Sequence, residues 1–160
     1  MKEKILSVIE KNSRISIEDL AVLLGEPVEA VAQAVMEMEH DKVICGYHTI
    51  INWDKVETQK VNALIEVRVT PQRNLGFDKI AERIYNFPEV ESIYLMSGGF
   101  DFVIFLEGKT LQEVAEFVSS KLSTLESVLS TATHFVLKKY KDHGTIIAEQ
   151  PKKERMLITP

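Results

Sequence analysis

The apolar residues of 61–140 follow two alternating rhythms, and this alternation constrains the fold more than any other feature of the chain. Segments in which every second residue is apolar predict strands, and segments with apolar residues three or four apart predict helices. In chain order the segments are 61–70, 77–87, 90–96, 100–106, 111–125 and 128–140. They read β-α-β-β-α-β. Right-handed crossovers turn that order into a four-stranded antiparallel sheet with both helices on one face, a ferredoxin-like sandwich of the α+β class.

The opposite face of this sheet has no helix to cover it. Six apolar residues alternate with inward positions along the strands, so some of them must lie on the uncovered face. They are Val67, Val69, Tyr94, Phe102, Ile104 and Phe135. A large exposed apolar face is usually an interface, so we expect a homodimer.

Residues 1–51 follow a helical rhythm instead. A first helix is expected over 2–11. Ser16 stands three residues before Asp19, as in a capping box, and this pair predicts the start of a second helix. Gly25 is placed to end that helix in a left-handed turn.

A third helix is expected from Pro27, which suits a first helical turn, to residue 39. Its inward residues should be Val28, Val31, Val35 and Met38. The alternating residues of 43–51 then predict a short strand or hairpin. Three helices followed by β structure describe a winged helix-turn-helix. The expected divisions are a winged helix-turn-helix at 1–51, a polar linker at 52–60, a sheet domain at 61–144 and a polar tail at 145–160.

Charge and hydropathy narrow the function classes. The chain carries 19 basic and 24 acidic side chains, a net charge of −5, which excludes a strongly basic nucleic-acid coat. Most of the excess acid lies in residues 1–50. No apolar run reaches the ~18 residues that span a bilayer, and the N-terminus lacks the pattern of a signal peptide. We expect a cytoplasmic protein with no membrane contact, and the single cysteine fits a reducing compartment.

Residue patterns for catalysis are weak. The four histidines are scattered without metal-ligand spacing, and no nucleophile motif or phosphate loop occurs. Cys45 follows Ile44 in an apolar segment, where a packed thiol is more common than a nucleophile. We therefore expect no enzyme, no metal site and no cofactor.

The most informative local motif is Ser97-Gly98-Gly99-Phe100-Asp101. Two glycines between strands leave backbone N–H groups open to a carboxylate, and Asp101 could accept a hydrogen bond from an ammonium group. Both groups belong to an amino acid. A hairpin turn that Asp101 only caps explains the same residues equally well. Thr131 and Thr133 lie two apart on the last strand and would add hydroxyls to one face of it. The high β-propensity of threonine is an alternative explanation for both residues.

These features resemble the Lrp/AsnC (feast/famine) family of transcriptional regulators. Residues 38–47, Met-Glu-x-x-Lys-Val-Ile-x-Gly-Tyr, resemble the family's Leu-Glu-x-x-Gly-Val-Ile-x-Gly-Tyr. Residues 98–101 resemble its Gly-x-Tyr/Phe-Asp signature, and 131–133 its Thr-x-Thr-like segment. The resemblance implies a homodimer, able to form a tetramer or octamer, that binds double-stranded DNA and senses an amino acid between dimers. The effector site it implies comprises Ser97, Gly98, Gly99, Asp101, Thr131 and Thr133.

The third helix departs from the family, in which it usually carries outward arginines. Residues 27–39 hold three glutamates and no lysine or arginine. Glu29 and Glu37 would face DNA phosphates at a cost, and only Gln33 is well suited to read base edges. The DNA-contacting residues are therefore expected to be Lys11, Arg14, Gln33 and Lys42.

Two other interpretations remain. The acidic third helix also fits an effector-binding oligomer whose helix-turn-helix has lost DNA binding and which acts through protein partners. A small ferredoxin-like enzyme is the third interpretation, and the lack of a nucleophile–base pair in the sequence speaks against it.

Overall fold

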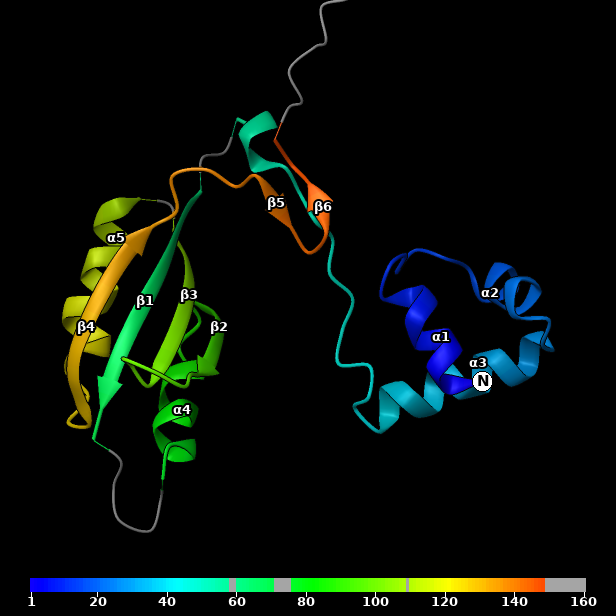
Figure 1. Cartoon of the computed structure of the whole chain (residues 1–160), viewed down its shortest axis with the longest axis horizontal. Helices are drawn as coiled ribbons and strands as arrows, with labels where there is room; N and C mark the ends of the chain where they lie inside the picture. Colours follow the sequence, from blue (N-terminus) through cyan, green and yellow to red (C-terminus); the bar gives the residue numbers. More distant parts are fainter. Residues whose placement is uncertain (58–59, 71–75, 109, 149–160) are drawn as a thin grey trace, which may run out of the picture. The chain divides into compact units, whose positions relative to one another are not determined.

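The chain divides after Ile50 into two compact units (Figure 1). The computed structural model describes residues 1–57, 60–70, 76–108 and 110–148. Unit 1 comprises residues 1–50, and unit 2 begins at Ile51.

Unit 1 consists of three helices around one apolar core: α1 (Lys2–Ile9), α2 (Ile17–Leu24) and α3 (Val28–His40). The buried residues of this core are Ile5, Leu20, Ala21, Val31, Ala34, Val35, Met38 and Ile44. Val28 was expected to point inward but is 39% exposed. At 100° per residue the buried stripe of α3 is centred about 70° away from Val28, and Ala34 takes the inward place.

Local hydrogen bonds fix both ends of α2. The Ser16 hydroxyl oxygen accepts from the backbone N–H of Asp19 at 3.0 Å. Gly25 follows the helix with φ +68°, in the left-handed region that glycine adopts at low cost. The capping pair and the glycine stop predicted from the sequence are both confirmed.

The end of α3 holds a lysine in the left-handed region. The N–H of Val43 donates to the Met38 carbonyl at 2.8 Å, and the N–H of Lys42 donates to the Glu39 carbonyl at 3.2 Å. These are the two bonds of a Schellman motif, in which the left-handed residue is usually glycine. Lys42 has φ +58°, so its Cβ is crowded against the backbone.

The strand or hairpin expected over 43–51 does not form. Residues 43–52, all of them described, adopt no regular secondary structure. The described residues of unit 1 contain no strand to pair with them, and a lone strand leaves its backbone groups without partners. Ile44 is buried in the core, whereas Cys45 is exposed rather than packed and its thiol donates to the Lys42 carbonyl at 3.1 Å.

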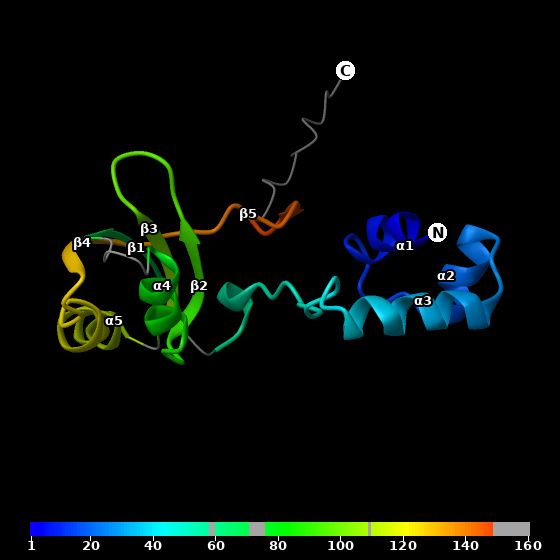
Figure 2. The same ribbon diagram turned by 90° about the horizontal axis from the view of Figure 1, so that it is seen from below.

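Unit 2 contains the four-stranded antiparallel sheet in the order β2-β3-β1-β4. Its strands are β1 (Val61–Val69), β2 (Val90–Leu95), β3 (Phe102–Gly108) and β4 (Val128–Phe135). Helices α4 (Asp78–Tyr85) and α5 (Leu111–Phe117) pack on one face, as Figures 1 and 2 show, and a π-helical turn, η2 (Val118–Leu122), continues α5. The predicted ferredoxin-like order is confirmed.

The core of unit 2 lies between the sheet and these helices. Its buried residues are Ala63, Ile65, Val67, Val69, Ile80, Ile84, Phe102, Ile104, Leu106, Val114, Phe117 and Leu122. Burial of a large aliphatic or aromatic side chain contributes about 1.5–3 kcal/mol, so this layer supplies most of the stability of the unit.

The strand register corrects the expected composition of the uncovered sheet face. Five of the six candidates pair with, or belong to, the helix-facing positions of β1: Val67, Val69, Phe102, Ile104 and Phe135. Only Tyr94 lies on the uncovered face. It pairs with Val103, which is one residue away from the helix-facing Phe102 and Ile104, and neighbouring residues of a strand point to opposite faces of the sheet. By the strand register, the residues on this face are Asn62, Leu64, Glu66, Arg68, Ser92, Tyr94, Val103, Phe105, Glu107, Ser130, Ala132 and His134.

The chain segments that precede and follow the sheet in sequence are linked by a hydrogen bond. Residues Trp53–Lys55 form a short 3₁₀ turn, η1, and the Asn52 side-chain amide donates to the Ile147 carbonyl at 3.3 Å. Strands β5 (Lys141–Asp142) and β6 (Thr145–Ile146) form a hairpin. The tail expected from residue 145 therefore begins with paired structure, and residues 149–160 lie outside the described chain.

Replacing Lys42 by glycine should stabilise unit 1 by about 1 kcal/mol, because glycine adopts a positive φ without the Cβ clash. Urea unfolding followed by far-ultraviolet circular dichroism measures this change. Lys42→Ala is the matched control, since it removes the same charge but keeps the Cβ, and its stability should stay near that of the wild type. Equal stabilisation by both variants would assign the effect to charge and contradict the backbone explanation.

Candidate functional site

The outer face of α3 is a stripe of exposed side chains spaced three and four residues apart. It consists of Glu29, Gln33, Met36, Glu37 and His40. In a helix-turn-helix this surface of the second helix of the motif enters the major groove. Its composition, with two carboxylates and no arginine or lysine, is unusual for a surface that approaches phosphates.

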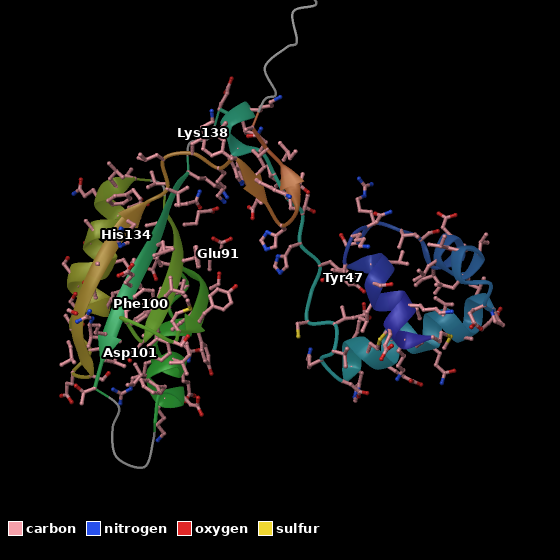
Figure 3. The ribbon with its side chains drawn as sticks, in the orientation of Figure 1. Tyr47, Glu91, Phe100, Asp101, His134 and Lys138 are labelled. Atoms are coloured by element: carbon pink, nitrogen blue, oxygen red, sulfur yellow. The ribbon has the colours of Figure 1, made fainter. Side chains whose placement is uncertain are left out.

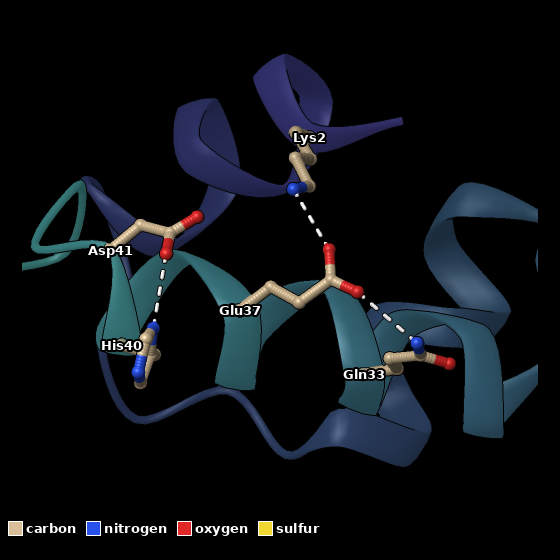
Figure 4. Close-up of polar contacts among 5 residues, drawn as sticks. All are labelled: Lys2, Gln33, Glu37, His40 and Asp41. Atoms are coloured by element: carbon tan, nitrogen blue, oxygen red, sulfur yellow. Dashed lines mark hydrogen bonds and ion pairs between the residues drawn. The ribbon is translucent and has the colours of Figure 1, made fainter.

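A lysine from α1 offsets part of this acidity. Lys2 Nζ lies 2.9 Å from Glu37 Oε2, and the Gln33 side-chain amide donates to Glu37 Oε1 at 3.1 Å (Figure 4). The hydrogen bond from Lys2 lowers the pKa of Glu37, and the bond from Gln33 lowers it further. In turn, the bond to Glu37 raises the pKa of Lys2. This pair could not be predicted from the sequence, because α1 and α3 meet only in the folded unit.

A second glutamate of α3 also has a partner. The Tyr47 hydroxyl donates to Glu39 Oε1 at 2.8 Å, and this bond, with a smaller effect of burial, raises the pKa of Tyr47. Tyr47 therefore attaches the irregular segment after α3 back onto the helix. Glu29 has no ion-pair partner among the residues that the structure describes.

The expected DNA-contacting residues lie on three parts of unit 1. Lys11 and Arg14 are exposed in the connection between α1 and α2, where the backbone N–H of Arg14 donates to the Asn12 side chain at 3.2 Å. Gln33 is on the outer face of α3, and Lys42 is exposed just after that helix. No hydrogen bond or ion pair links these four side chains to one another in the described residues.

The glycine turn of unit 2 is open to solvent. Ser97, Gly98 and Gly99 are exposed between β2 and β3, and Gly98 has φ +131°, which a residue with a Cβ rarely adopts. No heavy atom outside the immediate neighbours lies within 4 Å of a Cβ built on Gly98 or Gly99. A small ligand can therefore approach the backbone here.

One carboxylate oxygen of Asp101 accepts a hydrogen bond from the sheet. The N–H of Val69 donates to Asp101 Oδ2 at 2.8 Å, and the N–H of Asp101 donates to the Val67 carbonyl at 2.9 Å. These bonds hold the start of β3 against the end of β1, where the pairing with β4 shifts register. Figure 3 shows Asp101 at this end of the sheet, next to Phe100. Asp101 Oδ2 therefore bonds to β1, 32 residues away in sequence, rather than to the backbone of its own hairpin turn.

Thr131 and Thr133 lie apart from the glycine turn within one chain. They pair with Val67 and Ile65, so both half-buried hydroxyl-bearing side chains point to the helix-covered face of β4. Strand β1 separates β4 from β3, a spacing of about 10 Å. The predicted effector residues therefore form two groups, one at the glycine turn before β3 and one on β4.

A cavity of about 290 Å³ lies elsewhere, between α5 and β3. Leu106, Val114 and Phe117 form its apolar lining, and the paired side chains of Glu89 and Lys121 stand at its edge. The hydrogen bond from Lys121 lowers the pKa of Glu89. None of the predicted effector residues lines this cavity.

Two further features of the described residues bear on function class. They contain no group of three or more histidine, cysteine, aspartate or glutamate side chains arranged to hold a metal ion. Among them, no helix has the length and apolar character required to span a membrane.

Comparison with known proteins identifies the family. Residues 62–146 match the model of the Lrp/AsnC ligand binding domain. The HTH-type transcriptional regulator YugG of Bacillus subtilis, itself described as uncharacterized, is 46% identical over 158 residues, which cover 98% of this chain and 95% of that protein. The chain belongs to the Lrp/AsnC family. It is a helix-turn-helix transcriptional regulator with a ligand-binding domain.

Other regulators are similar to this chain at lower sequence identity. The leucine-responsive regulatory protein of Haemophilus influenzae is 23% identical, over 90% of this chain and 86% of that protein. The leucine response regulatory protein of Mycobacterium tuberculosis superposes with a TM-score of 0.73 at 21% identity, covering 92% of this chain and 97% of that one. A transcriptional regulator of Neisseria meningitidis, solved with L-Met, superposes with a TM-score of 0.71 at 20% identity. The superposition covers 91% of this chain and 93% of that one. These likenesses support the fold.

Proposed function

We propose that this Lrp/AsnC regulator binds double-stranded DNA through the outer face of α3 and changes its DNA occupancy when an amino acid binds at the glycine turn. The observation that carries the proposal is the family match across both units, one a helix-turn-helix and the other a ligand-binding domain. The Haemophilus relative is named for its response to leucine, and the Neisseria structure contains L-Met. An amino acid is therefore the first class of effector to test.

DNA binding by this chain should depend little on phosphate neutralisation by each protomer. The outer face of α3 has no lysine or arginine of its own, and the cations available in unit 1 are Lys2, Lys4, Lys11, Arg14 and Lys42. Oligomerisation raises the effective concentration of each binding unit, so weak contacts from several protomers can add up to a stable complex.

The slope of log affinity against log salt concentration should accordingly be shallow, about −1 to −3 for each bound protomer. Fluorescence anisotropy with the full chain and DNA from upstream of its own gene measures the slope. Arg14→Ala should weaken binding to all sequences alike and make the slope shallower by about one. A steep slope that Arg14→Ala leaves unchanged would place the DNA-binding surface elsewhere.

The effector proposal rests on the open glycine turn and the second oxygen of Asp101. Gly98 and Gly99 allow a carboxylate to approach backbone N–H groups, while Asp101 accepts from the α-ammonium. In this proposal Thr131 and Thr133 come from a neighbouring protomer, because β1 separates them from the turn within one chain. Ser97 is exposed in the turn and can supply a hydroxyl.

Asp101→Asn separates the two roles of this residue. The amide oxygen of asparagine still accepts from the Val69 N–H, but the negative charge is lost, so amino-acid affinity should fall about tenfold while the fold is kept. Thermal shifts with each of the twenty amino acids find the effector, and calorimetry then compares the variants.

Asp101→Ala is the contrasting variant for this experiment. It also removes the acceptor of the Val69 N–H, so it should lower stability by about 1–3 kcal/mol in addition to weakening the effector. Wild-type effector affinity in Asp101→Asn would mean that Asp101 acts only as a structural cap.

The uncovered sheet face is the proposed dimer interface. The rings of Tyr94 and Phe105 meet edge to face at 6.2 Å between centroids, beside Leu64 and Val103. His134 Nε2 lies 3.4 Å from Glu66 Oε1 at the β1–β4 side of this apolar centre. Stacking two such faces would bury the apolar centre of each, which favours a homodimer over a monomer.

Two tyrosines of equal exposure provide the test of this interface. Tyr94, on the uncovered face, is 55% exposed, and Tyr85, on α4, is 54% exposed. Tyr94→Asp should convert the dimer to a folded monomer, because a buried unpaired carboxylate costs several kcal/mol at an interface. Tyr85→Asp should leave the dimer intact. Light scattering that shows the same mass for both variants would contradict this interface.

A second function is favoured by the carboxylates of α3. Glu29 has no ion-pair partner among the described residues, and it projects from the face that would approach phosphates. An effector-binding oligomer that contacts protein partners instead of DNA would show this pattern. Failure of the full chain to shift any upstream DNA fragment, with or without amino acids, would favour this second function.

A further inference from the structure

Three side chains on the surface of unit 1 form a continuous chain of contacts across two helices. Lys2 of α1 contacts one oxygen of Glu37 at 2.9 Å, and Gln33 of α3 contacts the other at 3.1 Å. Figure 4 shows Glu37 of α3 between its two partners, and the Glu37 side chain is exposed. The adjacent acid, Asp41, has its own neighbour, since His40 Nδ1 lies 3.1 Å from Asp41 Oδ1.

The chemistry of Glu37 fixes the orientation of the Gln33 amide. Lys2 and Gln33 both lower the pKa of Glu37, so its carboxylate is ionised at neutral pH and can only accept hydrogen bonds. Gln33 must therefore turn its NH₂ group toward Glu37. One N–H is used in that bond, which leaves the second N–H and the carbonyl oxygen Oε1 free.

We propose that Lys2 and Glu37 are positioning residues that set Gln33 to read an adenine in the major groove. The free N–H and Oε1 of Gln33 match the N7 acceptor and the N6 donor of adenine, which form the usual bidentate contact of glutamine. The proposal rests on DNA binding through α3, as set out above, and deepens it by naming the base and the residues that orient its reader.

Lys2 has a second effect on the same surface. Its ammonium group offsets the negative charge of Glu37, which would otherwise repel DNA phosphates close to the groove. Glu37 can thus remain on the outer face of α3 and orient Gln33 without its full electrostatic cost. This explains why an acidic residue can occupy a position where the family usually has a cation.

The experiment starts from an operator selected out of random duplexes by the full-length wild-type chain. Dissociation constants are then measured at fixed salt for that operator and for all its single-base-pair variants. Gln33→Ala should abolish the preference for adenine at one base pair, which in the wild type should be about 5- to 150-fold. Circular dichroism confirms that each variant is folded.

The positioning residues give distinct results in the same assay. Lys2→Met should reduce the adenine preference at that base pair and also weaken binding to all duplexes, and Lys2→Arg should restore both. Glu37→Gln should tighten binding to all duplexes while the adenine preference falls, because the neutral amide no longer dictates which way Gln33 turns. Opposite changes in affinity and preference are not expected from a merely structural role.

Lys4→Met is the matched control, since it removes the same charge from the same exposed helix and Lys4 does not contact Glu37. If Lys2→Met and Lys4→Met have the same effect and both keep the adenine preference, Lys2 is only a general cation and the inference is overturned. Specific binding that Gln33→Ala leaves unchanged overturns the inference but not DNA binding. Absence of binding to any duplex by the wild type overturns both.

Discussion

One-sided burial of the sheet in unit 2 is the constraint on which the rest of the molecule depends. Strand β1 is central, and its residues Ala63, Ile65, Val67 and Val69 all point at α4 and α5. Once these positions are buried, period-two geometry sends the intervening residues to the other face. The uncovered face, on which the rings of Tyr94 and Phe105 meet, is therefore a direct consequence of how the core is filled.

The order of elements and the helix ends could be predicted from the sequence because their signals are local. The Ser16–Asp19 pair and Gly25 act within one turn of α2, and the strand and helix rhythms of 61–140 depend only on near neighbours. The face occupied by Phe102 and Ile104 could not be assigned in this way. Both faces of β3 are apolar, so alternation alone gives no preference, and the register with β1 decides.

The candidate sites show the same division between local and long-range information. The glycine turn was recognisable from its residues, but the bond from Val69 to Asp101 depends on β1 and β3 meeting in the fold. Likewise, the acidity of α3 can be read from the sequence, whereas the contact of Lys2 with Glu37 requires α1 to pack against α3. The strand expected after α3 was wrong for the complementary reason. Residues 43–51 alternate as a strand does, but the described residues of unit 1 contain no strand with which they could pair.

The bond between Asp101 and Val69 gives the glycine turn a direct mechanical connection to the middle of the sheet. In the proposed effector site, an ammonium group bound at the second oxygen of Asp101 would draw on the same carboxylate whose Oδ2 accepts from the Val69 N–H at the end of β1. Strand β1 is hydrogen-bonded to both β3 and β4, so a small displacement of β1 would also shift these two strands. In the proposed dimer, occupancy of the proposed effector site would bias how the two uncovered faces fit together, with no need for a moving lid or a hinge.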